Sequence, residues 1–167
     1  MPENQTDFIL GEALIRKDGI FDLTSLYKIP AEWGSSKGYL KIDKEIGKKY
    51  GSDGGEYEIK WMFIKKIDEY SKYTADIEIW VYKGLEVLVE HNGKEVPRIK
   101  GKIDVKIKLK MTTNMERAFN LTKKHQFIRK FLEKYIWKNR INALQGQGNE
   151  EFLDLQERIK KGLEQYT

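Results

Sequence analysis

The stretch that decides the fold is Lys100–Met111, which reads KGKIDVKIKLKM. Apolar and charged residues alternate through it, and this period of two is typical of a strand with one buried face and one wet face. The lysines therefore share one face, which meets either a polyanion or only water. The apolar positions are Ile103, Val105, Ile107, Leu109 and Met111.

The segments before this stretch carry the same alternation, in Tyr57–Ile67 and again in Tyr73–Gly84. Asn92–Gly93 lies between two apolar runs and is a preferred two-residue hairpin turn, because both positions need a positive φ angle. Pro97 cannot donate to a ladder, so this hairpin arm is predicted to be short or at an edge. A second turn is predicted at Gly51–Gly55, GSDGG.

The N-terminal part is predicted to contain a strand at Phe8–Arg16 and then a helical segment within Lys17–Tyr39. Asp22 is the expected N-cap, since its carboxylate can accept from the free N–H groups of the first turn. Pro30 cannot continue a helix without losing a hydrogen bond, so either a break at Ile29–Pro30 or a second short turn carrying Trp33 is expected, followed by a loop at Gly34–Gly38.

The C-terminal part changes to helical spacing. Lys123–Leu144 is predicted to be an amphipathic helix that covers the apolar face of the sheet, ending at QGQGN. Asn149–Gln165 is predicted to be an extra final helix, peripheral and a candidate for contact with another subunit. The expected apolar stripes are Phe127, Ile128, Phe131, Leu132, Tyr135, Ile136 and Ile141 in the first helix, and Phe152, Leu155, Ile159 and Leu163 in the second.

The predicted fold class is therefore α+β. An antiparallel sheet of five to six strands packs on a long C-terminal amphipathic helix, with an N-terminal helical segment and an extra final helix. Residues 1–6 are expected to be a flexible tail and residues 7–167 a single domain, since 167 residues are enough for one core and short for two.

The composition limits the classes of function that the protein can have. The net charge of +5 comes from 31 basic and 26 acidic residues, so the surface is mixed and permits polyanion binding without requiring it. With no cysteine there is no disulfide or thiolate site. No secretory signal and no apolar run of about 18–20 residues is found, so the expected location is the cytoplasm.

The residues that could carry catalysis form no motif. His91 and His125 have no metal-ligand spacing between them, and Asp76 and Glu78 lie on the wet face of a strand. The glycine-rich GSDGG leads into a strand and lacks the Gly-Lys-Ser/Thr of a phosphate loop. No catalytic, metal or cofactor residue is predicted, and an enzyme is not the favoured class.

The lysine row is the best candidate site. Lys106, Lys108 and Lys110 share a strand face, and Arg129 and Lys130 lie on the basic helix that follows. If these side chains were contiguous they could form a weak nucleic-acid or polyanion site. The competing explanation is a solvated sheet face, where lysines also protect against aggregation.

Four strings, GIFDLTSLYK, KGYLKIDKEIG, YEIKWMFIKKIDEYSKY and HQFIRKFLEKYIWKNRI, together resemble a family of small uncharacterised archaeal proteins from small-genome lineages. The similarity spans Gly19 to Leu163 and implies no activity. The order of elements also resembles helix-grip (lipid-transfer-like) domains, in which a curved sheet and a C-terminal helix enclose an apolar cavity. That resemblance implies a ligand cavity with Trp61, Phe63 and Tyr135 among its walls.

Three functions follow in order of preference. The first is a non-enzymatic domain that binds a partner protein or its own copies. The second is a helix-grip-like carrier of an apolar small molecule. The third is the weak polyanion binder described above, and neither a cofactor nor a membrane span is expected for any of the three.

Overall fold

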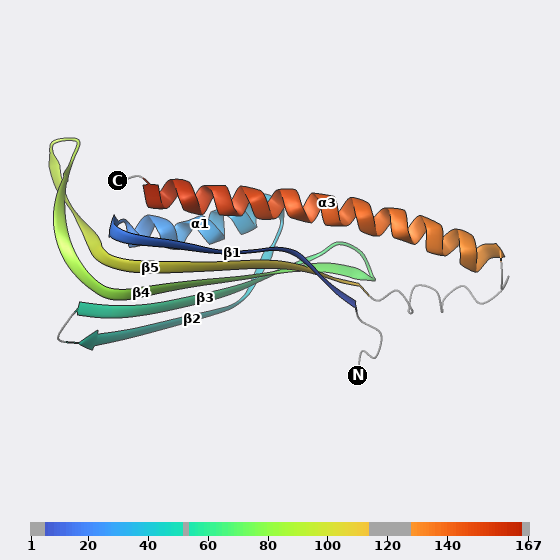
Figure 1. Cartoon of the computed structure of the whole chain (residues 1–167), viewed down its shortest axis with the longest axis horizontal. Helices are drawn as coiled ribbons and strands as arrows, with labels where there is room; N and C mark the ends of the chain where they lie inside the picture. The colour runs from blue at the N-terminus through green and yellow to red at the C-terminus, as the bar shows by residue number, and fades with distance from the viewer. Residues whose placement is uncertain (1–5, 52–53, 114–127, 165–167) are drawn as a thin grey trace.

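The computed structural model describes residues 6–51, 54–113 and 128–164. In these ranges, five long strands form one antiparallel sheet, and two helices lie against the same face of it (Figure 1). The predicted α+β class, with an antiparallel sheet and a C-terminal helix packed on it, is confirmed. The elements are β1 (Thr6–Phe21), α1 (Leu23–Lys37), β2 (Leu40–Gly51), β3 (Gly54–Lys66), β4 (Ser71–His91), β5 (Lys94–Thr113) and α3 (Ile128–Glu164).

The strand order is β1-β5-β4-β3-β2, so β1 pairs with β5, the last strand along the chain, and β1 and β2 form the two edges of the sheet. The predicted alternation is confirmed, because the apolar side chains of β3, β4 and β5 are buried on the face that the helices cover. The core of the sheet consists of Ile59, Trp61, Phe63, Tyr73, Ala75, Ile77, Ile79, Val81, Ile103, Val105, Ile107, Leu109 and Met111.

The predicted hairpin is also confirmed. Asn92 and Gly93 have φ angles of 53° and 78°, and His91 is paired with Lys94. The last pair between β1 and β5 is Phe21 with Ile99, so beyond it β4 and β5 continue as a ribbon of two strands. We call the part of this ribbon from residue 85 to residue 98 the arm. Pro97 therefore lies at a free edge, as predicted.

The arm bends toward the helices (Figure 1). Where the arm leaves the sheet, Gly19 pairs with Gly101, and Gly55 pairs with Gly84. The register between β4 and β5 shifts between Tyr82 and Leu85, where Lys83 adopts a φ angle of 52°. Such a bulge bends a strand and increases its twist. We call these four glycines the glycine row.

The predicted turn at 51–55 is shorter than expected, because β3 already begins at Gly54.

Helix α1 begins as predicted, but the predicted break at Pro30 and the loop after it are wrong. The Ser25 N–H and hydroxyl donate to Asp22 at 3.3 and 2.6 Å. The helix continues through Pro30 to Lys37 and ends at Gly38, which has a φ angle of 84°. An internal proline costs about 3 kcal/mol. Complete burial of Trp33, whose indole N–H donates to the Glu151 carbonyl at 3.0 Å, offsets that cost.

The C-terminal region is one helix of 37 residues, so the predicted end at QGQGN and the separate final helix are wrong. Gly148 lies so close to Leu10 and Tyr73 that a Cβ there would clash, so this glycine permits close packing and does not stop the helix. The second stripe, from Phe152 to Leu163, is buried as an apolar stripe should be, but it packs in the core and is not peripheral.

The first stripe does not cover the sheet as predicted. Ile141 is buried, but Tyr135 and Ile136 have 63% and 64% of their surfaces exposed. The helix extends beyond the end of the sheet, so none of the described strands lies beneath its first turns (Figure 1). Phe127 lies outside the described residues, as do the side chains of Ile128, Phe131 and Leu132.

The glycine row leads to a first prediction. A Cβ at position 101 would lie 2.8 Å from the Tyr82 carbonyl oxygen and 2.9 Å from that of Lys83, so Gly101→Ala should destabilise the fold by about 1–3 kcal/mol. Gly146→Ala is the control: a Cβ there meets nothing within 4 Å, and helix propensity favours it by about 1 kcal/mol. Urea unfolding measures both, and equal effects of the two variants would contradict the close approach.

Candidate functional site

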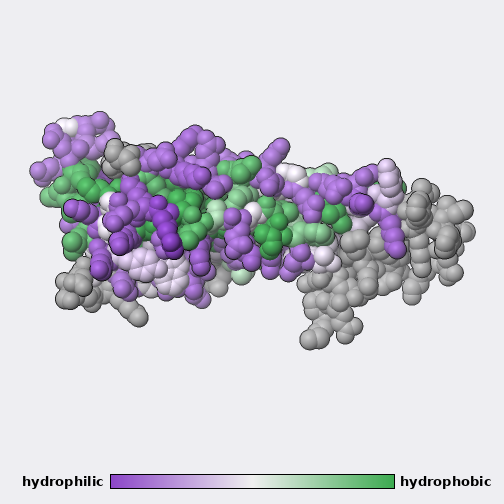
Figure 2. Space-filling model, viewed as in Figure 1, coloured by the Kyte–Doolittle hydropathy of each residue, from purple (hydrophilic) through white to green (hydrophobic). Residues whose placement is uncertain are grey.

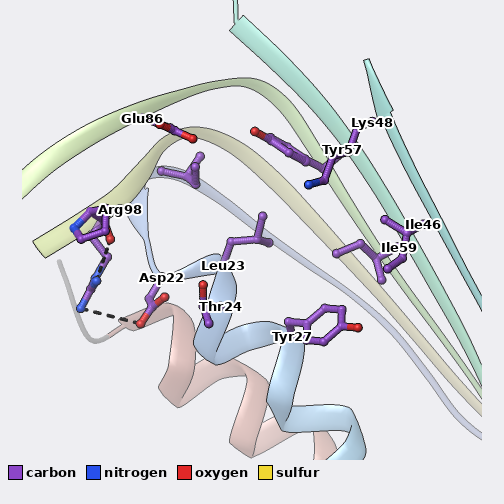
Figure 3. Close-up of a pocket in the computed structure, with 12 residues that line it drawn as sticks. Asp22, Leu23, Thr24, Tyr27, Ile46, Lys48, Tyr57, Ile59, Glu86 and Arg98 are labelled. Carbon is purple, nitrogen blue, oxygen red and sulfur yellow. Dashed lines mark hydrogen bonds and ion pairs between the residues drawn. The ribbon is translucent and has the colours of Figure 1, made fainter. Parts of the chain in front are cut away.

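The bend leaves a groove on the concave face, between the arm, the edge of the sheet and the start of α1 (Figure 3). Its volume is about 480 Å³, within the range of small-molecule sites. Five elements contribute to it, which is why no single motif in the sequence marks it. The lining residues are Asp22, Leu23, Thr24, Tyr27, Ile46, Lys48, Tyr57, Ile59, Glu86, Pro97, Arg98 and Ile99.

The interior of the groove is mainly apolar. Leu23 and Tyr27 come from one side of α1, and Ile59 forms part of the sheet beneath them. Ile46 lines the groove from the edge strand β2 and keeps 53% of its surface exposed. Glu86 and Ile99 are directly paired, so Leu88, two residues along the arm, continues the same face with 67% exposed. A ligand here would bury apolar surface that the protein itself leaves open.

An ion pair ties the arm to the helix. Arg98 approaches the Asp22 carboxylate at 3.7 Å, and their side chains are only 13% and 16% exposed. Burial by itself would raise the pKa of Asp22, but hydrogen bonds from Ser25 and the charge of Arg98 outweigh it and lower that pKa. The carboxylate is thus ionised, and it both caps α1 and holds the arm over its first turn.

Lys48 is placed differently from Arg98. Its ammonium group lies 5.8 Å from the centroid of the Tyr57 ring, across the β2–β3 ladder, and points into the groove (Figure 3). Among the described residues no carboxylate forms an ion pair with it. Glu86 stands on the opposite wall and is exposed. The groove therefore combines an apolar interior with one cation that has no carboxylate partner.

The residues that the sequence proposed as cavity walls are not brought together. Trp61 and Phe63 are buried, with Trp61 packed on Tyr27 at 5.5 Å between ring centroids and Phe63 on Trp33 at 6.5 Å. Tyr135 is on the exposed first part of α3. Trp61 and Phe63 belong to the buried core beside the groove, and Tyr135 is not among the residues that line the groove.

The lysine row lies on the convex face, which the helices do not cover. Its charges are matched across the ladders: Lys106 is paired with Glu78, and Lys108 with Asp76. Lys110 lies 3.8 Å from the Asp7 carboxylate. Such cross-strand pairs stabilise a sheet and neutralise its face.

Arg129 and Lys130, the helix half of the predicted polyanion site, are in the first turn of α3, and their side chains lie outside the described residues. The polyanion site therefore stays a prediction. Figure 2 shows hydrophilic residues interspersed among hydrophobic ones on the visible surface.

A buried polar cluster that the sequence did not reveal fixes α3 on the sheet. Glu151 accepts from the Tyr39 hydroxyl at 2.7 Å and from the Lys65 ammonium at 2.6 Å. Burial, followed by the proximity of Glu151, raises the pKa of Tyr39 far above its usual value and that of Tyr73 to about 12. The phenols therefore stay protonated, and the cluster is suited to holding the helix in register.

Other kinds of site find little support in the part of the chain that the structure describes. There, no three His, Cys, Asp or Glu side chains are grouped as metal ligands would be. His91 is exposed beside the hairpin turn, and His125 lies outside the described residues. No helix within the described ranges has the length and apolar character needed to cross a membrane.

Comparison of the chain with protein-family models, with curated proteins and with solved structures gave no match. The resemblance to small archaeal proteins therefore stays a prediction, and the function has to be argued from the geometry.

The buried cluster gives a second prediction. Glu151→Gln should destabilise the protein by about 2–4 kcal/mol, because the amide leaves the Lys65 charge without its partner. Glu157→Gln on the same helix is the control: its pair with Lys161 is exposed, so the change should stay within about 0.5 kcal/mol. Urea unfolding at neutral pH measures both, and a neutral effect of Glu151→Gln would show that the cluster does not hold the helix.

Proposed function

We propose that the protein is a binding domain that holds an apolar or amphipathic small molecule in the groove between α1, the arm and the edge of the sheet. The observation that carries this proposal is the groove itself, about 480 Å³ in volume and lined largely by apolar side chains. The proposal develops the helix-grip-like alternative that was predicted from the sequence. Trp61 and Phe63 form the core beside the site, and Tyr135 has no part in it.

Three further features support this proposal. The sheet is curved and α1 lies on its concave face, so the groove opens between these two layers (Figure 1). Ile46, which lines the groove, keeps 53% of its surface exposed, and Leu88, on the same face of the arm as Glu86, keeps 67% exposed. The Asp22–Arg98 pair fixes the two walls relative to each other, and a preformed site loses less free energy on binding.

The third prediction tests the groove. The uncharged fluorophore 1-aminoanthracene should bind with enhanced emission, and Ile46→Arg should weaken its binding at least about tenfold by placing a charge in the apolar wall. Leu40→Arg is a matched control on the same strand, because Leu40 is 71% exposed and does not line the groove. Fluorescence titration measures both variants. No binding by the native chain, or equal binding by both variants, would reject the proposed function.

Self-association is a second candidate, and one observation favours it. The first turns of α3 extend past the sheet and expose Tyr135 and Ile136, two large apolar side chains next to each other. Aromatic and aliphatic residues of this kind are enriched at the centres of protein interfaces. We propose that a second copy of the chain covers them, in line with the protein–protein function favoured from the sequence.

The fourth prediction concerns this assembly. Sedimentation equilibrium should give a mass above the 19.7 kDa of one chain, falling on dilution. The double variant Tyr135→Glu, Ile136→Glu should be monomeric, because two charges cannot be buried in such a contact. Leu153→Glu, at an exposed position of the same helix, should leave the mass unchanged. A native chain that is monomeric at all concentrations would contradict self-association.

A further inference from the structure

We propose that the groove selects amphiphiles with an anionic head, such as a carboxylate on an apolar chain, and that Lys48 is the residue that selects them. The inference rests on the proposed function, because it names the ligand class of the same groove. It is argued from the four charged side chains that line the groove, Asp22, Lys48, Glu86 and Arg98.

Two of these charges are already used within the protein. The Asp22 carboxylate accepts the Ser25 N–H and hydroxyl and lies 3.7 Å from Arg98. Its charge is thus satisfied by the cap and by the guanidinium, and a cationic ligand head would have to compete with both. Arg98, for its part, is held by Asp22 and donates to the Pro97 carbonyl at 2.7 Å. The pair is a structural tie that contributes little net charge.

The charge of Lys48, in contrast, is available to a ligand. On the concave side its neighbour across the ladder is Tyr57, and no carboxylate of the described residues pairs with its ammonium. The aromatic ring holds the ammonium over the groove by a cation–π contact, which leaves its outward side open (Figure 3). An anionic head placed there would find a positioned cation next to an apolar wall, where charge attraction is stronger than in bulk water.

Glu86 is the competing charge, and it favours a cationic head. It is exposed on the arm, where water screens its charge. With Asp22 occupied and Glu86 screened, the field in the groove favours a negative head at Lys48, with the apolar chain lying along Ile46 and Ile59 toward Ile99.

Three amphiphiles with the same chain and different heads test this inference, each as a monomer, below the micelle concentration of the two charged compounds and below the solubility limit of the alcohol. Dodecanoate, 1-dodecanol and dodecyltrimethylammonium are titrated against bound 1-aminoanthracene. Dodecanoate should displace the fluorophore at a concentration about 3- to 10-fold lower than the other two, and added salt should reduce this advantage.

Variants assign the preference to Lys48. Lys48→Met should bring dodecanoate to the level of dodecanol, and Lys48→Glu should reverse the order of the two charged heads. Lys106→Glu, the same charge change on the convex face, should leave the order unaltered. Lys48 is exposed, so these variants should fold, and circular dichroism checks this.

The possible failures are distinguishable. Equal displacement by all three heads, or a preference for the cation, overturns the anionic selection while the proposed function stands. Failure of all three amphiphiles and of the fluorophore to bind rejects the proposed function itself. Binding to vesicles of anionic phospholipid, with no displacement by monomeric dodecanoate, also overturns the inference, since the protein would then recognise a membrane surface.

Discussion

The close approach of the β4 and β5 backbones at the glycine row is the constraint on which the shape of the molecule depends. Gly101 faces the carbonyl groups of Tyr82 and Lys83 at a separation that leaves no room for a side chain. The bulge on the opposite strand turns the arm toward α1. Without that turn, Glu86 and Ile99 would continue in the plane of the sheet, and the first turn of α1 would have no wall opposite it.

The two helices are then placed by contacts that converge on one residue of α3. The backbone carbonyl of Glu151 accepts from Trp33, and its carboxylate accepts from Tyr39 and Lys65. Because Trp33 and Tyr39 lie at the end of α1, this cluster fixes α1 against both the sheet and α3. The start of α1 is fixed separately, through Asp22 and Arg98. The groove is therefore held at two points, one at each end of α1.

Local features were predicted from the sequence and long-range ones were not. The alternation in Lys100–Met111 and the turn at Asn92–Gly93 depend on a few neighbouring residues, and the structure reproduces both. The break at Pro30 was wrong because burial of Trp33, a contact with α3, outweighs a local cost. The end at QGQGN was wrong for a similar reason, since Gly148 serves the packing of α3 on Leu10 and Tyr73.

In the candidate site, too, the charged residues of a strand could be predicted, but not the residues that they face across the ladders. The alternation placed the lysines of β5 on one face correctly, but it could not show that Glu78 and Asp76 stand across the ladder from Lys106 and Lys108. Lys48 was not predicted to be a site residue, because in the sequence it is one of several lysines on a basic strand. Its distinction is that the residue across the ladder is Tyr57, an aromatic ring in place of a carboxylate. What a lysine on a sheet can bind thus depends on its cross-strand partner, which is set by register and not by net charge.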